Sequence, residues 1–145
     1  MNSSQTSLSL GLLLLRLGFG GLMLTHGIPK LMNYSTLATQ FPDPLGLGSQ
    51  ISVLLAIGAE VGCSLLIILG LFTRLATLPL IVTMLVAIFI VHGADPFAKK
   101  EAAITYLIPY LTLLLTGPGQ YAVDALLQKV WPGSRKNTDS ADLKA

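Results

Sequence analysis

Two ionisable residues, Arg16 and Glu60, lie inside long apolar stretches and are the strongest candidates for chemistry in this sequence. Arg16 interrupts the apolar run 8–28, and Glu60 interrupts the run 51–72. An ionised side chain at the depth of a bilayer costs roughly 3 kcal/mol or more unless it is paired or hydrated, so such residues often mark functional sites. A glutamate in this position can relay protons, and an arginine can donate hydrogen bonds to the oxygen atoms of a ligand.

Helical geometry predicts that these two charges meet. If consecutive helices cross a membrane in opposite directions, Arg16 lies about 12 Å from the terminus side of its helix and Glu60 about 17 Å, at 1.5 Å per residue. Long side chains can close that difference, so we expect an ion pair between helices one and two. Such a pair either belongs to a functional site or only fixes the packing of the two helices.

Other side chains with donor groups lie on the same helices or near their ends. At 100° per residue, one face of the first helix carries Arg16, Gly20, Met23, Gly27 and Lys30, and Phe19 and His26 flank that face. Tyr106 and Tyr110 stack one turn apart on a later helix. The candidate ligand-binding residues are His26, Lys30, His92, Tyr106 and Tyr110.

Histidine and cysteine usage argues against two kinds of site. A zinc or iron site takes three or four ligands, and His26 and His92 have no carboxylates at a suitable spacing, so we expect no metal. Cys63 is the only cysteine, which excludes an internal dithiol relay like that of disulfide-generating membrane enzymes. Any redox role therefore needs a bound cofactor or a partner.

Composition indicates an integral membrane protein. The sequence is 52% hydrophobic and only 11% charged, whereas an ordinary soluble domain has about 25% charged residues. Helices of a soluble bundle need a charged outer face, which these segments lack. The net charge of +2 is too small to indicate nucleic acid, so the expected partner is the lipid bilayer.

The apolar segments predict an all-α fold, an integral membrane four-helix bundle in one domain, residues 1–133. The predicted helices are residues 8–28, 51–72, 75–91 and 98–116. A Gly-Pro-Gly breaker at 117–119 ends the fourth helix, and residues 120–131 are predicted to lie at the membrane interface. Residues 134–145 are polar without periodicity, which predicts a disordered cytoplasmic tail.

The distribution of Lys and Arg favours a cytoplasmic location for both termini, because basic residues concentrate on the cytoplasmic side of membrane proteins. The basic residues near the loops on the other side are Lys30, Lys99 and Lys100. Those on the side of the termini are Arg74, Lys129, Arg135, Lys136 and Lys144. Arg74 and Asp124 fall on the same side, and we expect them to form an ion pair.

An ordered set of short motifs resembles the DoxX family of small four-helix membrane proteins. The set covers residue 10 to about 127 and consists of Leu15-Arg16-Leu17-Gly18, His26-Gly27, Lys30, Glu60, Gly70-Leu71, Thr73-Arg74, His92, Glu101, Gly117-Pro118-Gly119 and Asp124. Gln120 stands where the family usually shows a basic residue. The resemblance marks Arg74, Gly117, Gly119 and Asp124 as a structural motif.

The resemblance also implies a location and a function. It places the chain as a multi-pass protein in the bacterial cytoplasmic membrane, similar to subunits linked to quinone reduction. The expected function is a redox-associated, quinone-linked membrane subunit of an oxidoreductase, with a quinone as cofactor and Glu60 and Arg16 as the best candidates for catalytic residues. A redox partner protein would supply the electrons, because the sequence has no haem, flavin or iron-sulfur motif. An oligomer is compatible with this expectation.

Two alternatives stay open. The bundle could be a non-enzymatic assembly or ligand-binding protein, which only a partner would distinguish from the redox subunit. A small-molecule transporter that uses Glu60 for proton exchange has less support, because Arg16 at a similar depth would neutralise the glutamate before a cationic substrate arrives.

Overall fold

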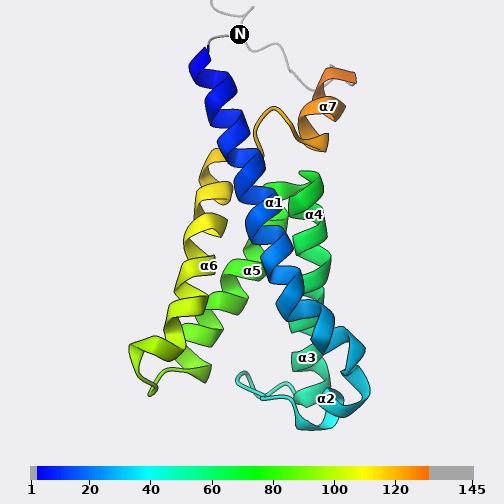
Figure 1. The fold of residues 1–145 in the computed structure, drawn as a ribbon. Coiled ribbons are helices and arrows are strands. Elements are labelled where there is room, and N and C mark those ends of the chain that lie inside the picture. The colour runs from blue at the N-terminus through cyan, green and yellow to red at the C-terminus, as the bar shows by residue number, and fades with distance from the viewer. Residues whose placement is uncertain (1–2, 131–145) are drawn as a thin grey trace, which may run out of the picture.

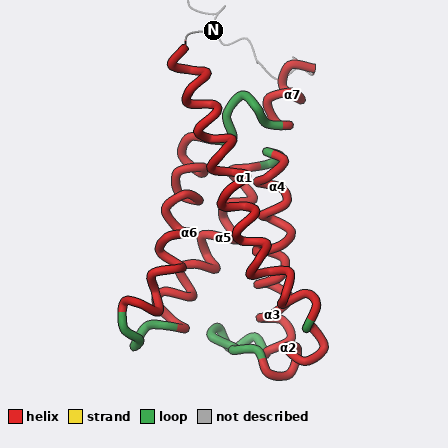
Figure 2. The backbone as a smooth tube through the Cα atoms, in the orientation of Figure 1, coloured by secondary structure: helices red, strands yellow, loops and turns green. Residues whose placement is uncertain are grey.

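The computed structural model describes residues 3–130, which fold into helices joined by short connections (Figure 1). These residues contain no β-strand (Figure 2), so the predicted all-α fold class is confirmed. The predicted disordered tail, residues 134–145, lies outside the described residues.

The helices combine into long continuous rods. In chain order they are α1 (Ser3–Met32), α2 (Tyr34–Gln40), α3 (Ser49–Ile57), the π-helix η1 (Gly58–Cys63), α4 (Ser64–Leu69), α5 (Thr73–Val86), the π-helix η2 (Ala87–Val91), α6 (Phe97–Thr116) and α7 (Val123–Val130). The three rods Ser3–Met32, Ser49–Leu69 and Thr73–Val91 are long and apolar enough to cross a membrane. Helix α6 has 20 residues and is less apolar, because residues 99–101 near its start are all charged.

The four long rods form a bundle whose two ends differ. Helices α5 and α6 run antiparallel and make the most extensive contact, and α1 packs across α4 and η1 (Figure 1). The N-terminal end of α1 and helix α7 lie at one end of the bundle, the terminus side. The connections 41–48 and 92–96 lie at the other end, the loop side, where the α5–α6 pair spreads away from α2 and α3.

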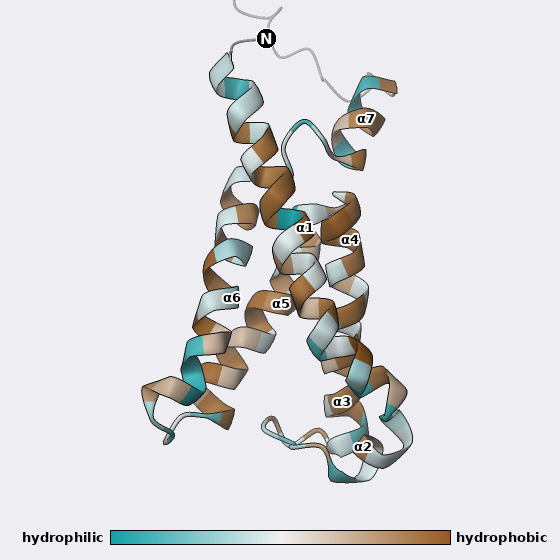
Figure 3. Ribbon diagram, viewed as in Figure 1, coloured by the Kyte–Doolittle hydropathy of each residue, from teal (hydrophilic) through white to brown (hydrophobic). Residues whose placement is uncertain are grey.

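The outward surfaces of the long helices are largely apolar (Figure 3). Leu14, Leu55 and Leu115 are 70%, 56% and 77% exposed, although each is a large hydrophobic residue. Such exposure on long helices is what contact with lipid tails requires. The apolar surface therefore supports a bilayer as the surroundings of this bundle.

Glycines let α1 approach the second rod closely. A Cβ atom at Gly20 would lie 2.6 Å from Cγ1 of Ile68, and one at Gly27 would lie 2.7 Å from Cγ2 of Val61. Small residues at such positions allow helix backbones to pack tightly in membranes. The face of α1 that carries these glycines is the buried one, as the helical periodicity predicts.

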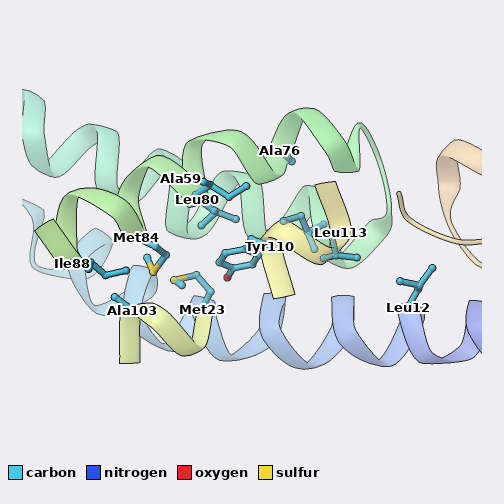
Figure 4. Close-up of a cluster of buried hydrophobic side chains, with 12 residues drawn as sticks. Leu12, Met23, Ala59, Ala76, Leu80, Met84, Ile88, Ala103, Tyr110 and Leu113 are labelled. Atoms are coloured by element: carbon cyan, nitrogen blue, oxygen red, sulfur yellow. The ribbon is translucent and has the colours of Figure 1, made fainter. Parts of the chain in front are cut away.

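The centre of the bundle is filled by side chains from all four rods. Figure 4 shows Met23 of α1, Met84 of α5 and Tyr110 of α6 directed toward one another, with Leu80 beside them. Tyr110 and Leu80 are completely buried. This core holds the helices in the register that positions the polar residues.

Two π-helical segments interrupt the regular helices. A π turn adds a residue to the helical turn and occurs frequently at functional sites. Glu60 lies in η1, and η2 ends at Val91, directly before His92. The segment η1 lies in the middle of the second rod, and η2 lies at the loop-side end of the third rod.

Candidate functional site

Glu60 is paired with a lysine. It lies buried in η1, and its Oε2 accepts a hydrogen bond from Nζ of Lys30, in the last turn of α1. The side chain of Glu60 is 7% exposed and that of Lys30 is 26% exposed. The backbone of α1 comes close enough for this pair because residue 27 is a glycine, at which a Cβ would lie 2.9 Å from Cβ of Glu60.

The expected ion pair between Arg16 and Glu60 is therefore wrong. Arg16 lies beside Ile68 at the end of α4, whereas Glu60 lies beside Gly27, three turns farther along α1. The N-terminal turns of α1 extend beyond the end of α4 (Figure 1). Arg16 and Glu60 would lie at similar depths only if both rods began at the same plane on the terminus side. The extra N-terminal turns of α1 remove Arg16 from the level of Glu60.

Arg16 instead binds main-chain carbonyl groups. It is 1% exposed, and its guanidinium donates to the carbonyl oxygens of Pro118 at 2.9 Å, Tyr121 at 2.8 Å and Ile68 at 3.4 Å. These contacts connect α1 with the end of α4 and with the segment between α6 and α7. The geometry is that of a structural anchor on the terminus side.

A cavity of about 400 Å³ adjoins the Lys30–Glu60 pair. Its walls come from α3, η1, α5, η2 and the connection between α2 and α3. Most of the lining is apolar, and the polar side chains in it are Lys30, Ser52, Glu60, Thr83 and His92. An apolar pocket of this size with a few polar groups is typical of a small-molecule site.

The two histidines do not share this cavity. His92 lines it, and Nδ1 of His92 lies 2.8 Å from Oδ2 of Asp95. His26 packs against Tyr106 instead, with ring centroids 5.5 Å apart in an edge-to-face arrangement. Of the two histidines, only His92 shares the cavity lining with Lys30. The spacing of three residues between His92 and Asp95 was a signal for their contact that the sequence reasoning missed.

The tyrosines line the core rather than the cavity. The rings of Tyr106 and Tyr110 are stacked with centroids 6.3 Å apart, as the one-turn spacing predicts. The hydroxyl of Tyr110 donates to the carbonyl oxygen of Phe19 at 3.4 Å. Tyr110 therefore has a main-chain acceptor on α1.

The residues of the predicted structural motif meet on the terminus side. Arg74, Gly117, Gly119 and Asp124 line one surface hollow of about 520 Å³. The glycines have φ of 81° and 80°, a left-handed conformation that favours glycine. These positive φ values allow the chain to turn from α6 toward α7.

The expected ion pair between Arg74 and Asp124 is wrong. The carboxylate of Asp124 accepts hydrogen bonds from the backbone N–H groups of Phe72 at 3.0 Å and Thr73 at 3.3 Å. Arg74 donates to the carbonyl oxygen of Leu115 at 3.1 Å. Free N–H groups at a helix start attract a carboxylate, so Asp124 caps α5 and Arg74 binds the end of α6.

Residues that the sequence reasoning passed over form part of the cavity wall. Phe41, Pro42, Pro44 and Leu45 line it from the α2–α3 connection. Within residues 3–130, no group of three or more His, Cys, Asp or Glu side chains is placed to hold a metal ion.

Comparison with known proteins identifies related sequences. The family model DoxX matches residues 11–93. An uncharacterized membrane protein of Mycobacterium tuberculosis is 30% identical, with 79% of this chain and 80% of that protein covered. An uncharacterized protein of Haemophilus influenzae is 27% identical, with 68% of this chain and 69% of that protein covered. No solved structure gives a significant match.

Proposed function

This chain belongs to the DoxX family of membrane proteins, and on that basis we propose that it binds a quinone-like molecule in the cavity beside Lys30 and Glu60. In this proposal it is a quinone-linked membrane subunit that works with a redox partner protein. We place it in the bacterial cytoplasmic membrane with both termini on the cytoplasmic side.

The single observation that carries the proposal is the cavity with a polar pair in its wall. Its volume of about 400 Å³ lies within the range of roughly 300–1,000 Å³ for small-molecule sites. A quinone needs an apolar surface for its ring and tail and a donor for each carbonyl oxygen. Lys30 offers a donor for one carbonyl oxygen, and the surrounding side chains supply the apolar surface.

Lys30 and Glu60 have complementary tasks at this site. An ammonium group has three N–H donors, and Lys30 directs two of them to Glu60 and to the carbonyl oxygen of His26, the latter at 3.4 Å. The remaining donor is free for a ligand oxygen. The carboxylate of Glu60 can accept a proton or pass one on. A bound quinone would supply two-electron redox chemistry, with electrons from the partner.

Arg16 has a structural task in this proposal, and Glu60 is the better candidate for a catalytic residue. Nη1 and Nη2 of Arg16 donate to carbonyl groups on the terminus side, and the residue is absent from the cavity lining. His92 also lies in the lining, at the loop side of the cavity. Transport by a free glutamate is disfavoured because Glu60 is paired with Lys30.

A non-enzymatic ligand-binding or assembly protein is the second candidate. It is favoured by the mostly apolar lining of the cavity, which suits a lipid tail as well as a quinone ring. In that case the cavity would hold a lipid or another apolar molecule, and no partner would deliver electrons.

The proposal is tested by identifying what stays bound after purification in mild detergent. We expect mass spectrometry to find a quinone in the wild type and to find none in Glu60→Gln. Glu101→Gln is the matched control, because Glu101 is an exposed carboxylate outside the cavity, and it should retain the quinone. Ordinary phospholipid alone in all three proteins would contradict the quinone proposal and favour the second candidate.

A second variant separates loss of the site from loss of the fold. Val86 lines the cavity and is only half-buried, so Val86→Phe fills the space while leaving the Lys30–Glu60 pair in place. We expect this variant to fold, as judged by its helical circular dichroism and its elution volume, and to lose the quinone. A folded Val86→Phe protein with a full complement of quinone would place the ligand elsewhere.

A further inference from the structure

One side of the cavity faces lipid tails and another faces water on the loop side. This difference determines how a ligand reaches the cavity. We propose that the ligand enters sideways from the bilayer between α3 and α5, while the segment 41–45 closes the cavity toward water on the loop side. The substrate class is then a membrane-dissolved molecule with an apolar tail. The substrate class rests on the proposed function, whereas the route into the cavity can be tested without any quinone.

The side of the cavity between α3 and α5 is formed by residues that also belong to the apolar surface. Leu55 of α3 and Val82 of α5 line the cavity and are 56% and 55% exposed. Both lie on rods that are long and apolar enough to cross a membrane. Both side chains therefore lie at the rim of the cavity, on a surface that faces lipid tails.

The loop side of the cavity is covered by an anchored segment. Residues 41, 42, 44 and 45 line the cavity from the connection between α2 and α3. Asp43 in the middle of this segment accepts hydrogen bonds from the backbone N–H groups of Leu47 at 2.8 Å and Gly48 at 2.9 Å, and from Oγ of Ser52 at 2.9 Å. The carboxylate therefore ties the cover to the first turn of α3.

The charge state of Asp43 supports a permanent anchor. The hydrogen bond from the Gly48 backbone N–H, together with those from Ser52 and Leu47, holds the pKa of Asp43 below its ordinary value. A carboxylate that is hydrogen-bonded in this way stays ionised at neutral pH and remains an acceptor. The cover is therefore expected to stay closed under ordinary conditions.

Exposure differs between the polar pair and the apolar residues at the lipid-facing opening. Glu60 is buried, and Lys30 is partly buried against it, whereas the apolar residues at the opening are more than half exposed. A molecule with a polar head and an apolar tail matches this gradient, with the head at Lys30 and the tail between Leu55 and Val82. Entry from water would instead require the ligand to pass Phe41 and its neighbours.

The route is tested with a nitroxide spin label at position 56. Ala56 lines the cavity, and Cys63 is the only cysteine, so Ala56→Cys in a Cys63→Ser background gives one labelling site. Collisions with oxygen report contact with lipid, and collisions with a water-soluble nickel chelate report contact with water. Matched labels at Leu54, an exposed residue on the same rod outside the lining, and at Ala94, an exposed loop residue, provide the lipid and water references.

We expect the label at position 56 to behave like the label at 54, with frequent oxygen collisions and few nickel collisions. Asp43→Ala should increase the nickel collisions at 56 and leave those at 94 unchanged. Nickel collisions at 56 that equal those at 94 while Asp43 is intact would overturn the lateral route. Nickel collisions at 56 that do not respond to Asp43→Ala would show that the segment 41–45 is not the cover.

A binding measurement tests the substrate class separately. In lipid nanodiscs, Leu55→Trp should weaken binding of a benzoquinone with an isoprenoid tail about tenfold, equivalent to about 1.4 kcal/mol, and affect the same headgroup without a tail much less. Leu54→Trp is the control and should change neither. Lipid contact at position 56 without any quinone binding would refute the proposed function alone. Equal weakening by both tryptophans would refute the tail position.

Discussion

Replacing Arg16 by leucine is expected to destabilise the fold more than replacing any exposed arginine. Arg16 is buried and donates two short hydrogen bonds, at 2.9 Å to Pro118 and 2.8 Å to Tyr121. A hydrogen bond to a charged group contributes about 1.5–3 kcal/mol to stability, so the two together contribute about 3–6 kcal/mol. Leucine cannot replace either bond, and the carbonyl groups would lose their donor.

Part of this loss is offset because a buried charge is removed. Among the described residues, no carboxylate lies within salt-bridge distance of Arg16, so its guanidinium bears a desolvation cost without an ionic partner. We therefore expect a net loss of about 3 kcal/mol in the free energy of unfolding. For a chain of this size that corresponds to a fall in Tm of roughly 10 °C.

The assay is thermal unfolding in a mild detergent, combined with hydrogen exchange of the segment 117–122. Exchange in this segment should increase because Arg16 no longer holds it against α1. Arg74→Leu is the control, since Arg74 is exposed and makes one hydrogen bond at 3.1 Å, and it should lower Tm by only a few degrees. If Arg16→Leu and Arg74→Leu lower Tm equally, the hydrogen bonds of Arg16 do not stabilise the fold as reasoned.

Three further predictions concern the loop half of the molecule. Gly27→Ala should lower the free energy of unfolding by about 1–3 kcal/mol, because the new Cβ would lie 2.9 Å from Cβ of Glu60. Gly21→Ala, where a Cβ meets nothing within 4 Å, should leave Tm unchanged or raise it, because alanine favours the helix over glycine. An equal loss of Tm in both variants would refute the close approach. Lys30→Met should lower the free energy of unfolding by about 3–5 kcal/mol, because it leaves Glu60 unpaired. The double variant Lys30→Met with Glu60→Met should recover most of the lost Tm. If the double variant does not recover, the two residues do not interact. Hydrogen bonds lower the pKa of Asp43 in the folded state. Asp43 therefore stabilises the segment 41–48 fully above the ordinary aspartate pKa of about 4. This stabilisation is lost as the pH falls through the lower pKa of the folded state. The hydrogen-exchange protection factors of this segment, which are corrected for the intrinsic pH dependence of exchange, should therefore stay constant at pH 5 and above and fall only below about pH 4. A fall at higher pH would contradict the anchor.

Several features of the site follow directly from local sequence patterns. The helical period predicted the buried face of α1, since burial of Arg16, Gly20, Met23 and Gly27 depends only on which residues share one side of a helix. The stacking of Tyr106 on Tyr110 likewise follows from their one-turn spacing. Such patterns need no knowledge of the neighbouring helix.

The partners of the charged groups could not be obtained in this way. Glu60 pairs with Lys30 instead of Arg16 because the N-terminal turns of α1 extend past the end of α4, which shifts one helix along the other by several turns. Hydropathy reports the length of a rod and leaves its axial offset undefined. Asp124 binds the start of α5 instead of Arg74, since free N–H groups at a helix start compete with a cation for a carboxylate.

The sequence by itself determined the class of the protein, the apolar helices and the buried stripe of α1, because these depend on composition and on local periodicity. Only the tertiary structure decided that Lys30 neutralises Glu60, that both π-helical segments border one cavity, and that an anchored loop covers it. Contacts of this kind depend on how far each helix slides and rotates against its neighbours, and that is set by the packing of all side chains together.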